Sequence, residues 1–490
     1  MRRVTTTPTN PEDTLKTVFG HTSFRPGQKE AVNAAMDGRN VFLTAPTGSG
    51  KSLCYQLPAA LQPQGETTLV ISPLIALMRD QIGALTKRGV PCTDLHSERS
   101  DHESLLAAIA QRKFRMVYTS PEQTQKEEVR DAIRRGNVKR MVVDEAHCLS
   151  QWGHDFRPAY AKLGAVAEMC GIAKVSAFTA TASTAVKDDI RKSLKLKKAY
   201  EQHEEPERPN LTYGVTHVEQ RMEKKEAIRE MIERYASGSH DGAIVYCGTR
   251  DATIEMSGYL NRRGISAGFY HGEIGVRARK QAEQGFLEDN PRVLAATNAF
   301  GMGVDKPNIR LIVHEQVPAT IQHYLQETGR AGRDGKPAHC HLLYHPDDMR
   351  LQEYFLEKNC PETLLPFGVF RVLKELKGMS HFQQNGFFHV DMFKFFRRFD
   401  VKDAKRHYEV IDRTIEVNAC LDILEHCGAI ERDGSFFRLV EDPDTKPALT
   451  TLVRKVTTTR REVKTALLKD MTDYLHQKRP TQDYLIKHMG

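Results

Sequence analysis

The chain has 490 residues, of which 40% are hydrophobic and 27% charged, a composition typical of folded, water-soluble proteins. At about 100–200 residues per domain, this length predicts about three domains. No apolar run approaches the roughly 20 residues that cross a bilayer, and residues 1–7 have no apolar stretch behind their arginines, so neither a membrane span nor a secretory signal is expected.

Short β-rich runs alternate with helical patterns over the first two-thirds of the chain, which is typical of parallel βαβ units. A charged, proline-containing linker at residues 204–210 interrupts the alternation, which then restarts. The sequence therefore predicts two α/β domains, at residues 1–205 and 206–350. The expected strands are 41–43, 69–71, 116–118, 141–143 and 175–178 in the first domain, and 243–246, 293–295 and 311–313 in the second.

The pattern changes after about residue 347, and residues 351–490 are predicted to form a mostly helical region. Apolar residues at helical spacing indicate one helix from Leu365 to Leu376 and another from Val417 to Cys427. Asp433-Gly434 between two short apolar runs predicts a β-hairpin. Helices followed by a hairpin favour a winged-helix module over a generic helical cap with a surface hairpin.

The net charge of +8 is mild, but residues 445–490 hold ten Lys or Arg and four Asp or Glu. A basic tail suits a polyanion such as nucleic acid, although charge alone fits a solvated helix surface equally well. The nine cysteines contain no C-x-x-C pair, which favours free thiols in an intracellular protein. Cys340, Cys360, Cys420 and Cys427 are expected to serve in core packing rather than to bind zinc.

A glycine-rich loop directly follows the first predicted strand. Glycines let backbone N–H groups wrap phosphates, the lysine reaches the β- and γ-phosphates, and the hydroxyl binds Mg²⁺. The strict pattern expects glycine where Ala45 stands, but the Gly-x-Gly-Lys-Ser core is intact. The residues expected to bind the phosphates are Thr47, Gly48, Ser49, Gly50, Lys51 and Ser52.

Acidic and basic partners for this loop occur elsewhere in the chain. Asp144 and Glu145 end an apolar strand, where Asp144 would hold Mg²⁺ and Glu145 would orient or deprotonate the attacking water. Arg330 and Arg333 lie three residues apart in the second domain, on one face if that stretch is helical. Arginines so placed can stabilise charge that develops on a phosphoryl group. The combination predicts a site for nucleotide hydrolysis built from both domains, whose cleft would open and close.

Taken together, the motifs from Phe19 to about Leu343 resemble those of the RecQ family of superfamily-two DNA helicases. The resemblance implies tandem RecA-like domains. It also implies that Arg25 packs on the adenine of the nucleotide and that Gln28 forms a hydrogen bond with the edge of the adenine. It also implies nucleotide contacts for Gly303 and Asp305, and DNA contacts for Ser120, Thr249, Arg250 and Asn298. The motifs that carry it are Phe19-Gly20-His21-Thr22-Ser23-Phe24-Arg25-Pro26-Gly27-Gln28, residues 72–81, 119–122, 178–182, 245–250 and 270–272, residues 297–307, and Gln326-Glu327-Thr328-Gly329-Arg330-Ala331-Gly332-Arg333-Asp334-Gly335.

Residues 148–158, just after the two acids, resemble the aromatic-rich loop that marks this family. The loop contains the only tryptophan of the chain. An exposed ring can stack on a base of any sequence, worth about 1–3 kcal/mol. In this context DNA contact is favoured over the core role that a lone tryptophan usually has. The expected DNA-binding residues of the loop are Trp152, His154, Phe156 and Arg157.

The resemblance implies an ATP- and Mg²⁺-dependent helicase that moves 3′ to 5′ on single-stranded DNA and unwinds tailed or forked duplexes in repair or recombination. Zinc is not expected, because the sequence has no C-x-x-C and Pro480-Thr481 stands about where the resemblance implies a cysteine. Either this member has lost the metal or the chain stops short of the cysteines. The hairpin around Asp433-Gly434 could act as a strand-separating wedge with Phe436 or Phe437. The rival functions are an RNA helicase and a non-catalytic nucleic-acid-binding or annealing protein. The expected location is the cytoplasm, near the nucleoid, in a bacterium, or the nucleus in a eukaryote.

Overall fold

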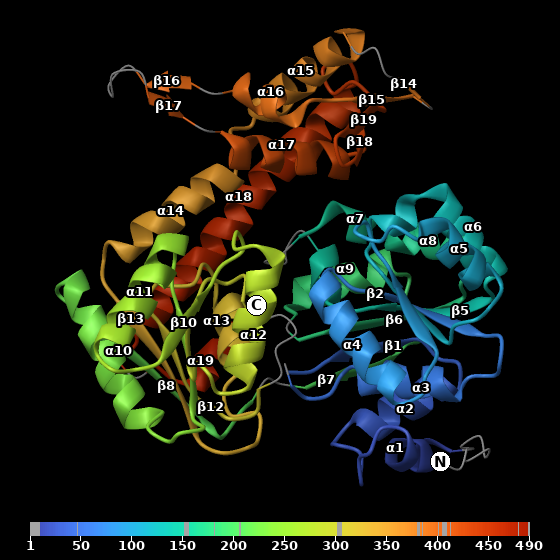
Figure 1. Ribbon diagram of the computed structural model, residues 1–490. Helices are drawn as coiled ribbons and strands as arrows, with labels where there is room; N and C mark the ends of the chain where they lie inside the picture. Colours follow the sequence, from blue (N-terminus) through green and yellow to red (C-terminus); the bar gives the residue numbers. More distant parts are fainter. Residues whose placement is uncertain are drawn as a thin grey trace. The chain divides into compact units, whose positions relative to one another are not determined.

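The structure is a computed structural model of the chain (Figure 1). It describes residues 10–46, 48–150, 156–180, 182–204, 207–300, 306–379, 383–384, 386–399, 401–403, 409–411, 413–478 and 480–488. The chain divides into two compact units: Met1–Asp348 with Met471–Gly490, and Met349–Asp470. Across these ranges, none of the helices has the length and apolarity needed to cross a membrane.

The first lobe of the first unit, residues up to 204, is built on a parallel seven-stranded sheet. The five predicted strands are confirmed. Two polar edge strands, β3 and β7, were not predicted, because their sequences Cys-Thr-Asp-Leu and Tyr-Glu-Gln-His lack an apolar run. In sheet order the strands are β3 (Cys92–Leu95), β4 (Met116–Thr119), β2 (Thr67–Ile71), β5 (Val138–Val143), β6 (Lys174–Thr179), β1 (Val41–Thr44) and β7 (Tyr200–His203).

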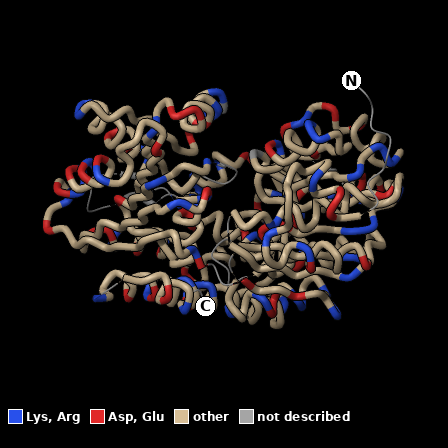
Figure 2. The backbone as a smooth tube through the Cα atoms, turned by 90° about the horizontal axis from the view of Figure 1, so that it is seen from below, with Lys and Arg blue, Asp and Glu red and all other residues tan. Residues whose placement is uncertain are grey.

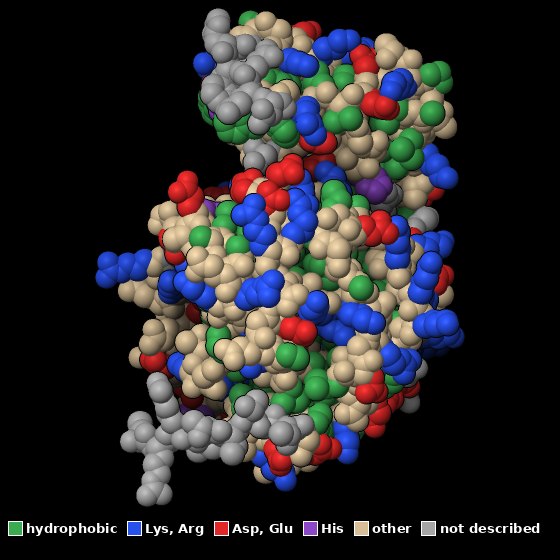
Figure 3. All heavy atoms as spheres, turned by 90° about the vertical axis from the view of Figure 1, so that its right-hand side faces the viewer, with side chains coloured by type: hydrophobic (Ala, Val, Ile, Leu, Met, Phe, Trp, Pro, Cys, Tyr) green, Lys and Arg blue, Asp and Glu red, His purple; other side chains and the backbone are tan. Residues whose placement is uncertain are grey.

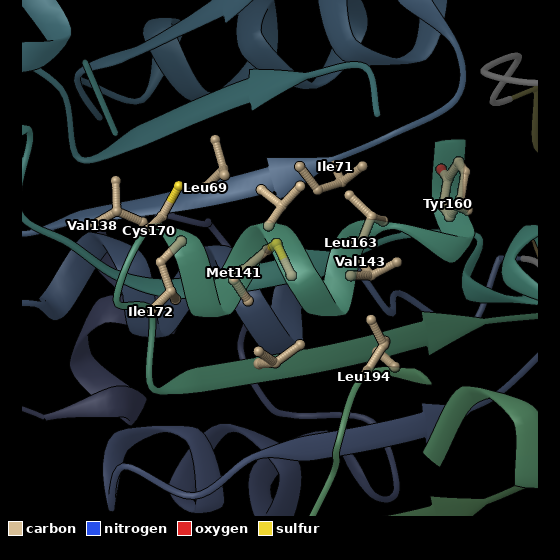
Figure 4. Packing of buried hydrophobic residues seen from close by; sticks show 14 of the residues in the cluster. Leu69, Ile71, Val138, Met141, Val143, Tyr160, Leu163, Cys170, Ile172 and Leu194 are labelled. Carbon is tan, nitrogen blue, oxygen red and sulfur yellow. The ribbon is translucent and has the colours of Figure 1, made fainter. Parts of the chain in front are cut away.

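Helices cover both faces of this sheet, and alternate residues of a strand belong to different apolar clusters. Leu69 and Ile71 of β2 pack with Leu163 on one face (Figure 4), whereas Val70 belongs to the cluster on the other. Burial on both faces explains the continuous apolar runs of the central strands. The helices are α1 (Pro11–Thr17), α2 (Gln28–Met36), α3 (Leu53–Leu61), α4 (Ile75–Lys87), α5 (His102–Ala110), η1 (Gln123–Gln125), α6 (Glu127–Arg135), η2 (Ala146–Leu149), α7 (Pro158–Ala161), α8 (Leu163–Met169) and α9 (Thr184–Ser193).

The second lobe, residues 207–344, has a parallel six-stranded sheet and confirms the second α/β domain. Its strands in sheet order are β10 (Ala267–Tyr270), β11 (Val293–Ala296), β9 (Gly242–Tyr246), β12 (Ile309–His314), β13 (Ala338–Tyr344) and β8 (Leu211–His217). Its helices are α10 (Arg221–Tyr235), α11 (Arg250–Arg262), α12 (Val276–Leu287) and α13 (Ile321–Thr328).

The second unit is mostly helical and includes the predicted hairpin. Strand β15 pairs with β19, and β19 pairs with β18, all antiparallel, next to α15, α16 and α17. The hairpin of β18 and β19 has Gly434 (φ +58°) at its turn, and the assignment of the unit as a winged helix stays a prediction. The elements are α14 (Asp348–Asn359), α15 (Leu365–Met379), β14 (Gln383–Gln384), β15 (Phe387–His389), α16 (Met392–Arg397), β16 (Val401–Asp403), β17 (Glu409–Ile411), α17 (Thr414–His426), β18 (Ile430–Asp433), β19 (Phe436–Leu439) and α18 (Pro447–Leu475).

The last described residues, including the end of α18 and α19 (Gln482–Lys487), pack in the first unit. Tyr474 is fully buried, its ring centroid 5.8 Å from that of Tyr324 on α13, and the Leu475 carbonyl lies 2.9 Å from His217 Nε2. The second unit is therefore inserted between the second lobe and a segment that completes that lobe.

Basic and acidic residues are interspersed along the backbone (Figure 2). On the face shown in Figure 3, hydrophobic side chains are likewise interrupted by charged ones.

Candidate nucleotide-hydrolysis site

The glycine-rich loop joins β1 to α3, as the sequence predicts. Gly48 and Gly50 have φ angles of +84° and +85°, a region that side chains with a Cβ rarely adopt. Their conformation turns the chain so that the loop runs directly into the N-terminus of α3, where backbone N–H groups lack helical partners. Thr47 lies outside the described residues.

The Lys51 ammonium is held within this loop. Its Nζ donates to the main-chain oxygens of Ala45 at 2.6 Å and Pro46 at 3.0 Å. Burial lowers the pKa of Lys51, while the negative charges of Glu145 and Asp144 act in the opposite direction. The loop thus positions a cation beside the two acids.

Gln28, the first residue of α2, and Arg25, three residues before it, contact the loop. Gln28 Nε2 donates to the oxygens of Ser49 and Gly50, at 3.0 and 3.2 Å, and Arg25 Nη1 donates to the Gly48 oxygen at 2.5 Å. The sequence predicted that both residues contact adenine. The contacts with adenine stay a prediction, whereas in the structure both residues support the backbone of the phosphate loop.

Asp144 and Glu145 follow β5, and both are close to Lys51. Burial, and then the neighbouring Glu145, raise the pKa of Asp144 to about 7. For Glu145, burial raises the pKa, but His147, Lys51 and Arg330 outweigh it, so the pKa lies below its ordinary value. The two adjacent carboxyls are therefore electrostatically different.

Glu145 is fixed by an unusual backbone and by His147. Its φ and ψ are 48° and 47°, the left-handed region, which is uncommon for a residue with a side chain and is concentrated at functional sites. His147 Nδ1 lies 3.3 Å from Glu145 Oε2 and 2.8 Å from Thr179 Oγ1 at the end of β6. The histidine therefore connects the acidic motif to the Thr179-Ala180 motif.

Two residues that the sequence did not single out complete the acid side of the site. Gln81 Nε2 donates to the Ser52 hydroxyl at 3.3 Å, and Gln81 Oε1 accepts from Tyr55 Oη at 3.0 Å. Tyr55 also reaches Asp144 Oδ2 at 3.4 Å. Gln81 is the last residue of the motif at 72–81, and nothing in the local sequence pattern indicates a bond to Ser52.

Arg330 and Arg333 follow α13 in turns, because the helix ends at Thr328, so the condition for a shared helical face is not met. Arg333 nevertheless reaches the glycine-rich loop, because a Cβ added to Gly48 would lie 3.5 Å from Arg333 Nε. Arg330 is 5% exposed and close enough to Glu145 to lower its pKa. The first unit thus brings both arginines to Lys51 and the acids.

The arginine segment is held by residues from the expected linker. Arg208 Nη2 donates to the oxygens of Ala331 and Gly332 at 2.9 and 2.8 Å, and Asn210 Nδ2 donates to the Gly332 oxygen at 2.9 Å. The sequence assigned residues 204–210 only a connecting role. The supporting contacts of Arg208 and Asn210 could not be predicted because they bridge more than 120 residues.

The expected DNA-binding residues have varied surroundings. Arg157 Nη1 donates to the Pro73 oxygen at 3.2 Å, and Phe156 is half-buried. The Thr249 hydroxyl accepts from the Ala252 N–H and caps α11, while exposed Arg250 pairs with Glu273. Ser120 is half-buried and Asn298 exposed. Trp152, His154, Gly303 and Asp305 lie outside the described residues.

The cysteines considered for zinc lie in different surroundings. Cys340 is buried in the second sheet, and Cys420 is buried in the core of the second unit. Within the described ranges, no group of three or more His, Cys, Asp or Glu could hold a metal.

Two protein-family models match the chain: the DEAD/DEAH box helicase over residues 25–189 and the helicase conserved C-terminal domain over residues 223–335. The helicase MrfA bound to DNA is a solved structure that resembles the chain with a TM-score of 0.58 and 15% sequence identity, and the match covers 92% of this chain and 61% of MrfA. The Mycobacterium smegmatis helicase Lhr bound to single-stranded DNA and AMP-PNP resembles it with a TM-score of 0.53 and 19% identity, over 90% of this chain and 60% of Lhr. At such identities, these likenesses support the fold alone.

Curated relatives are considerably more similar. The Haemophilus influenzae ATP-dependent DNA helicase RecQ is 40% identical over 71% of this chain, and the match covers 55% of the relative. The Synechocystis ATP-dependent DNA helicase RecQ is 37% identical, and the match covers 71% of this chain and 75% of the relative. The Bacillus subtilis probable ATP-dependent DNA helicase RecS is 38% identical, and the match covers 74% of this chain and 73% of the relative. The chain spans just over half the length of the first-named relative. The chain belongs to the RecQ family of helicases.

Proposed function

We propose that this protein is an ATP-dependent DNA helicase that moves 3′ to 5′ along single-stranded DNA and unwinds tailed or forked duplexes in DNA repair or recombination. The observation that supports the proposal most directly is the convergence of Lys51, the two acids and the two arginines in a chain of the RecQ family. The place of action would be the cytoplasm of a bacterium or the nucleus of a eukaryote.

The glycine-rich loop and its neighbours fit a nucleoside triphosphate with Mg²⁺. The Ser49 hydroxyl is buried and makes no hydrogen bond within the described ranges. The positive φ angles of Gly48 and Gly50 curve the loop, and backbone N–H groups of such a loop bind phosphates. Ser52 and Asp144 are the residues that would hold the metal, whose charge would polarise phosphate oxygens. Zinc is not part of the proposal.

The remaining chemistry belongs to residues of the chain. Glu145, whose pKa lies below its ordinary value, is ionised at neutral pH and would orient the attacking water and accept its proton. Lys51, Arg330 and Arg333 would stabilise negative charge on the phosphoryl group. Because the arginines come from the second lobe and Lys51 from the first, hydrolysis would remove an interaction that joins the lobes.

Movement along DNA would follow from a cycle in which the lobes close on ATP and part after hydrolysis. Side chains from both lobes would hold the strand alternately, mainly through its phosphates, with a ring stacked on a base. The residues proposed for these contacts are Ser120, Trp152, His154, Phe156, Arg157, Thr249, Arg250 and Asn298.

Steady-state ATP hydrolysis tests the substrate assignment. Phosphate release would be measured without nucleic acid, with single-stranded DNA and with single-stranded RNA of the same sequence. The proposal requires stronger stimulation by DNA, and loss of activity in Lys51→Ala. Equal or stronger stimulation by RNA would favour an RNA helicase, and absence of hydrolysis with DNA would favour a non-catalytic binding protein.

A further inference from the structure

Helix α18 of the second unit (red in Figure 1) has one buried and one exposed side. Val453 and Val456 pack in the core of the unit. On the opposite side, exposed residues recur at intervals of four, three, four and four positions, which aligns them along one face of a helix. These residues are Arg454, Thr458, Arg461, Thr465 and Lys469, and we call them the α18 stripe.

The stripe runs for fifteen helical steps, which at 1.5 Å per residue is about 22 Å. Between Arg454 and Lys469 the helix has six Lys or Arg and one acid, Glu462. Cations therefore outnumber anions strongly along this part of α18, and cationic side chains alternate with hydroxyl groups along the exposed face.

The charges of the stripe are not neutralised within the described part of the chain, and this distinguishes them from other cations of the unit. Arg454, Arg461 and Lys469 form no ion pair with any residue in the described ranges, and neither does neighbouring Lys455. Elsewhere in the unit, ion pairs join Arg371 to Asp444, Lys374 to Asp442, Arg398 to Glu375 and Arg432 to Asp422.

Two arginines of the stripe are held in place by uncharged groups. Arg461 Nη2 donates to the Cys360 oxygen at 2.6 Å, and the Arg454 guanidinium lies 6.0 Å from the centre of the Phe367 ring. Both contacts restrain the side chain without neutralising it. A row of restrained, uncompensated cations raises the repulsion within the folded protein, which a bound polyanion would relieve.

We infer that the α18 stripe binds the sugar–phosphate backbone of duplex DNA without reading its sequence. Twenty-two ångströms of duplex axis carry about six phosphates on each strand. This number is enough for each of the three cations of the stripe to contact a different phosphate. Threonine hydroxyls also bond phosphate oxygens, and Thr458 and Thr465 are exposed between the cations. This deepens the proposed function and rests on it, because it names a second surface for the DNA on which the motor acts.

Duplex DNA fits the stripe better than single-stranded DNA. Surfaces that bind unpaired strands combine cations with aromatic rings on which bases stack. The exposed positions from Arg454 to Lys469 include no aromatic residue, and no Asn or Gln that would read base edges. Arg, Lys and Thr alone are sufficient for contacts to the backbone of a rigid duplex.

Equilibrium binding of the full chain to a blunt 20-base-pair duplex, without ATP and over a series of salt concentrations, tests the inference. The variant Arg454→Gln/Arg461→Gln/Lys469→Gln removes three charges from the stripe. Its matched control, Arg371→Gln/Lys374→Gln/Arg398→Gln, removes three ion-paired charges from the same unit. We expect the stripe variant to bind at least tenfold more weakly in 0.1 M salt, while the control stays within about twofold of the wild type.

The salt series gives a second readout. The slope of log affinity against log salt is negative, and each lost phosphate contact reduces its magnitude by about 0.9. The magnitude of the slope should therefore be smaller by about 2–3 in the stripe variant. Thr458→Ala/Thr465→Ala should weaken binding and leave the slope unchanged, because hydroxyl groups displace no counterion. An unchanged slope in the stripe variant would overturn the inference.

Because Arg461→Gln removes the bond to Cys360, a second triple variant, Arg454→Gln/Lys455→Gln/Lys469→Gln, keeps that bond and should also bind weakly. Wild-type affinity in both triple variants, or an equal loss in the ion-paired control, would overturn the inference. So would an equal loss of single-stranded DNA binding, which would assign the stripe to unpaired strands.

The outcomes also separate this inference from the proposed function. Lys51→Ala should bind the duplex like the wild type, and the stripe variant should keep the ATPase activity stimulated by single-stranded DNA. If the wild type hydrolyses no ATP but the stripe variant still loses duplex affinity, only the proposed function fails.

Discussion

Glu145 combines an uncommon backbone conformation with a pKa below its ordinary value. The sequence predicted the pair of acids, because two carboxyls at the end of an apolar strand next to a glycine-rich loop have a clear chemical use. It could not predict which of the two is the easier to ionise. That difference depends on His147, Lys51 and Arg330, which come from three separate segments.

Replacing the Glu145 carboxylate by an amide should keep nucleotide binding and impair hydrolysis. We expect Glu145→Gln to lower kcat for DNA-stimulated ATP hydrolysis by about 10²–10⁴-fold, the usual contribution of a general base. Phosphate release and the binding of a fluorescent ATP analogue would be measured together. Exposed Glu168→Gln, in the same lobe, serves as control. A kcat within about twofold of the wild type would exclude Glu145 as the base.

At the scale of elements, apolar central strands were predicted and polar strands were not. Strands β13 and β8 lack the continuous apolar run of the predicted strands. Strand β13 has His339 and His341 among its seven residues, and several positions of β8 are half-exposed. Their pairing over seven positions comes from the topology of the sheet, which local sequence does not encode. The predicted helices α15 and α17 were found because their apolar residues follow helical spacing.

His341 should make the pairing of β8 and β13 sensitive to acid. Its Nε2 lies 2.8 Å from Thr216 Oγ1, and burial lowers its pKa to about 4. Unfolded histidine binds its proton near pH 6.5, so stability is complete above that value and falls as pH decreases towards 4. Between pH 7 and 5 the loss should be about 2 kcal/mol. His341→Gln should reduce the fall in Tm over this range, and exposed His21→Gln should not. An equal fall in all three proteins would contradict this.

The ion pair between Lys224 of α10 and Asp348 is another element-scale test. Both side chains are 2% exposed, the N–O distance is 2.6 Å, and Lys224 also donates to the Glu315 oxygen. Asp348→Asn would leave a buried, unpaired ammonium at a cost of about 3–5 kcal/mol. We expect a Tm lower by several degrees, and partial recovery in Lys224→Met/Asp348→Asn. A double variant less stable than the single variant would contradict this, because it would show that Lys224 stabilises the fold without Asp348, through its bond to the Glu315 oxygen.

At the scale of the whole molecule, the second unit is an insertion, because the chain leaves the first unit at Asp348 and returns at Met471. The sequence treated residues 351–490 as one region. The return occurs within α18, a continuous helix of 29 residues, and no glycine or proline marks the passage from one core to the other.

The return segment should be needed for the stability of the second lobe. Fully buried Tyr474 contacts Tyr324 of α13, the helix that leads into the arginine segment. Tyr474→Ala should cost about 3–5 kcal/mol, as for other large aromatic residues cut to alanine in a core. We expect a lower Tm together with lower ATPase activity, and near wild-type values for Tyr474→Phe, which keeps the ring. Unchanged Tm in Tyr474→Ala would contradict the observed packing.

Strand displacement on tailed duplexes tests the central claim most directly, because it reports activity, substrate and direction together. The full chain would be mixed with ATP, Mg²⁺ and duplexes that carry a 3′ tail, a 5′ tail or no tail. We expect ATP-dependent unwinding of the 3′-tailed duplex above the other two, and none with Lys51→Ala. No ATP-dependent unwinding by the intact chain, or unwinding unchanged in Lys51→Ala, would contradict the account.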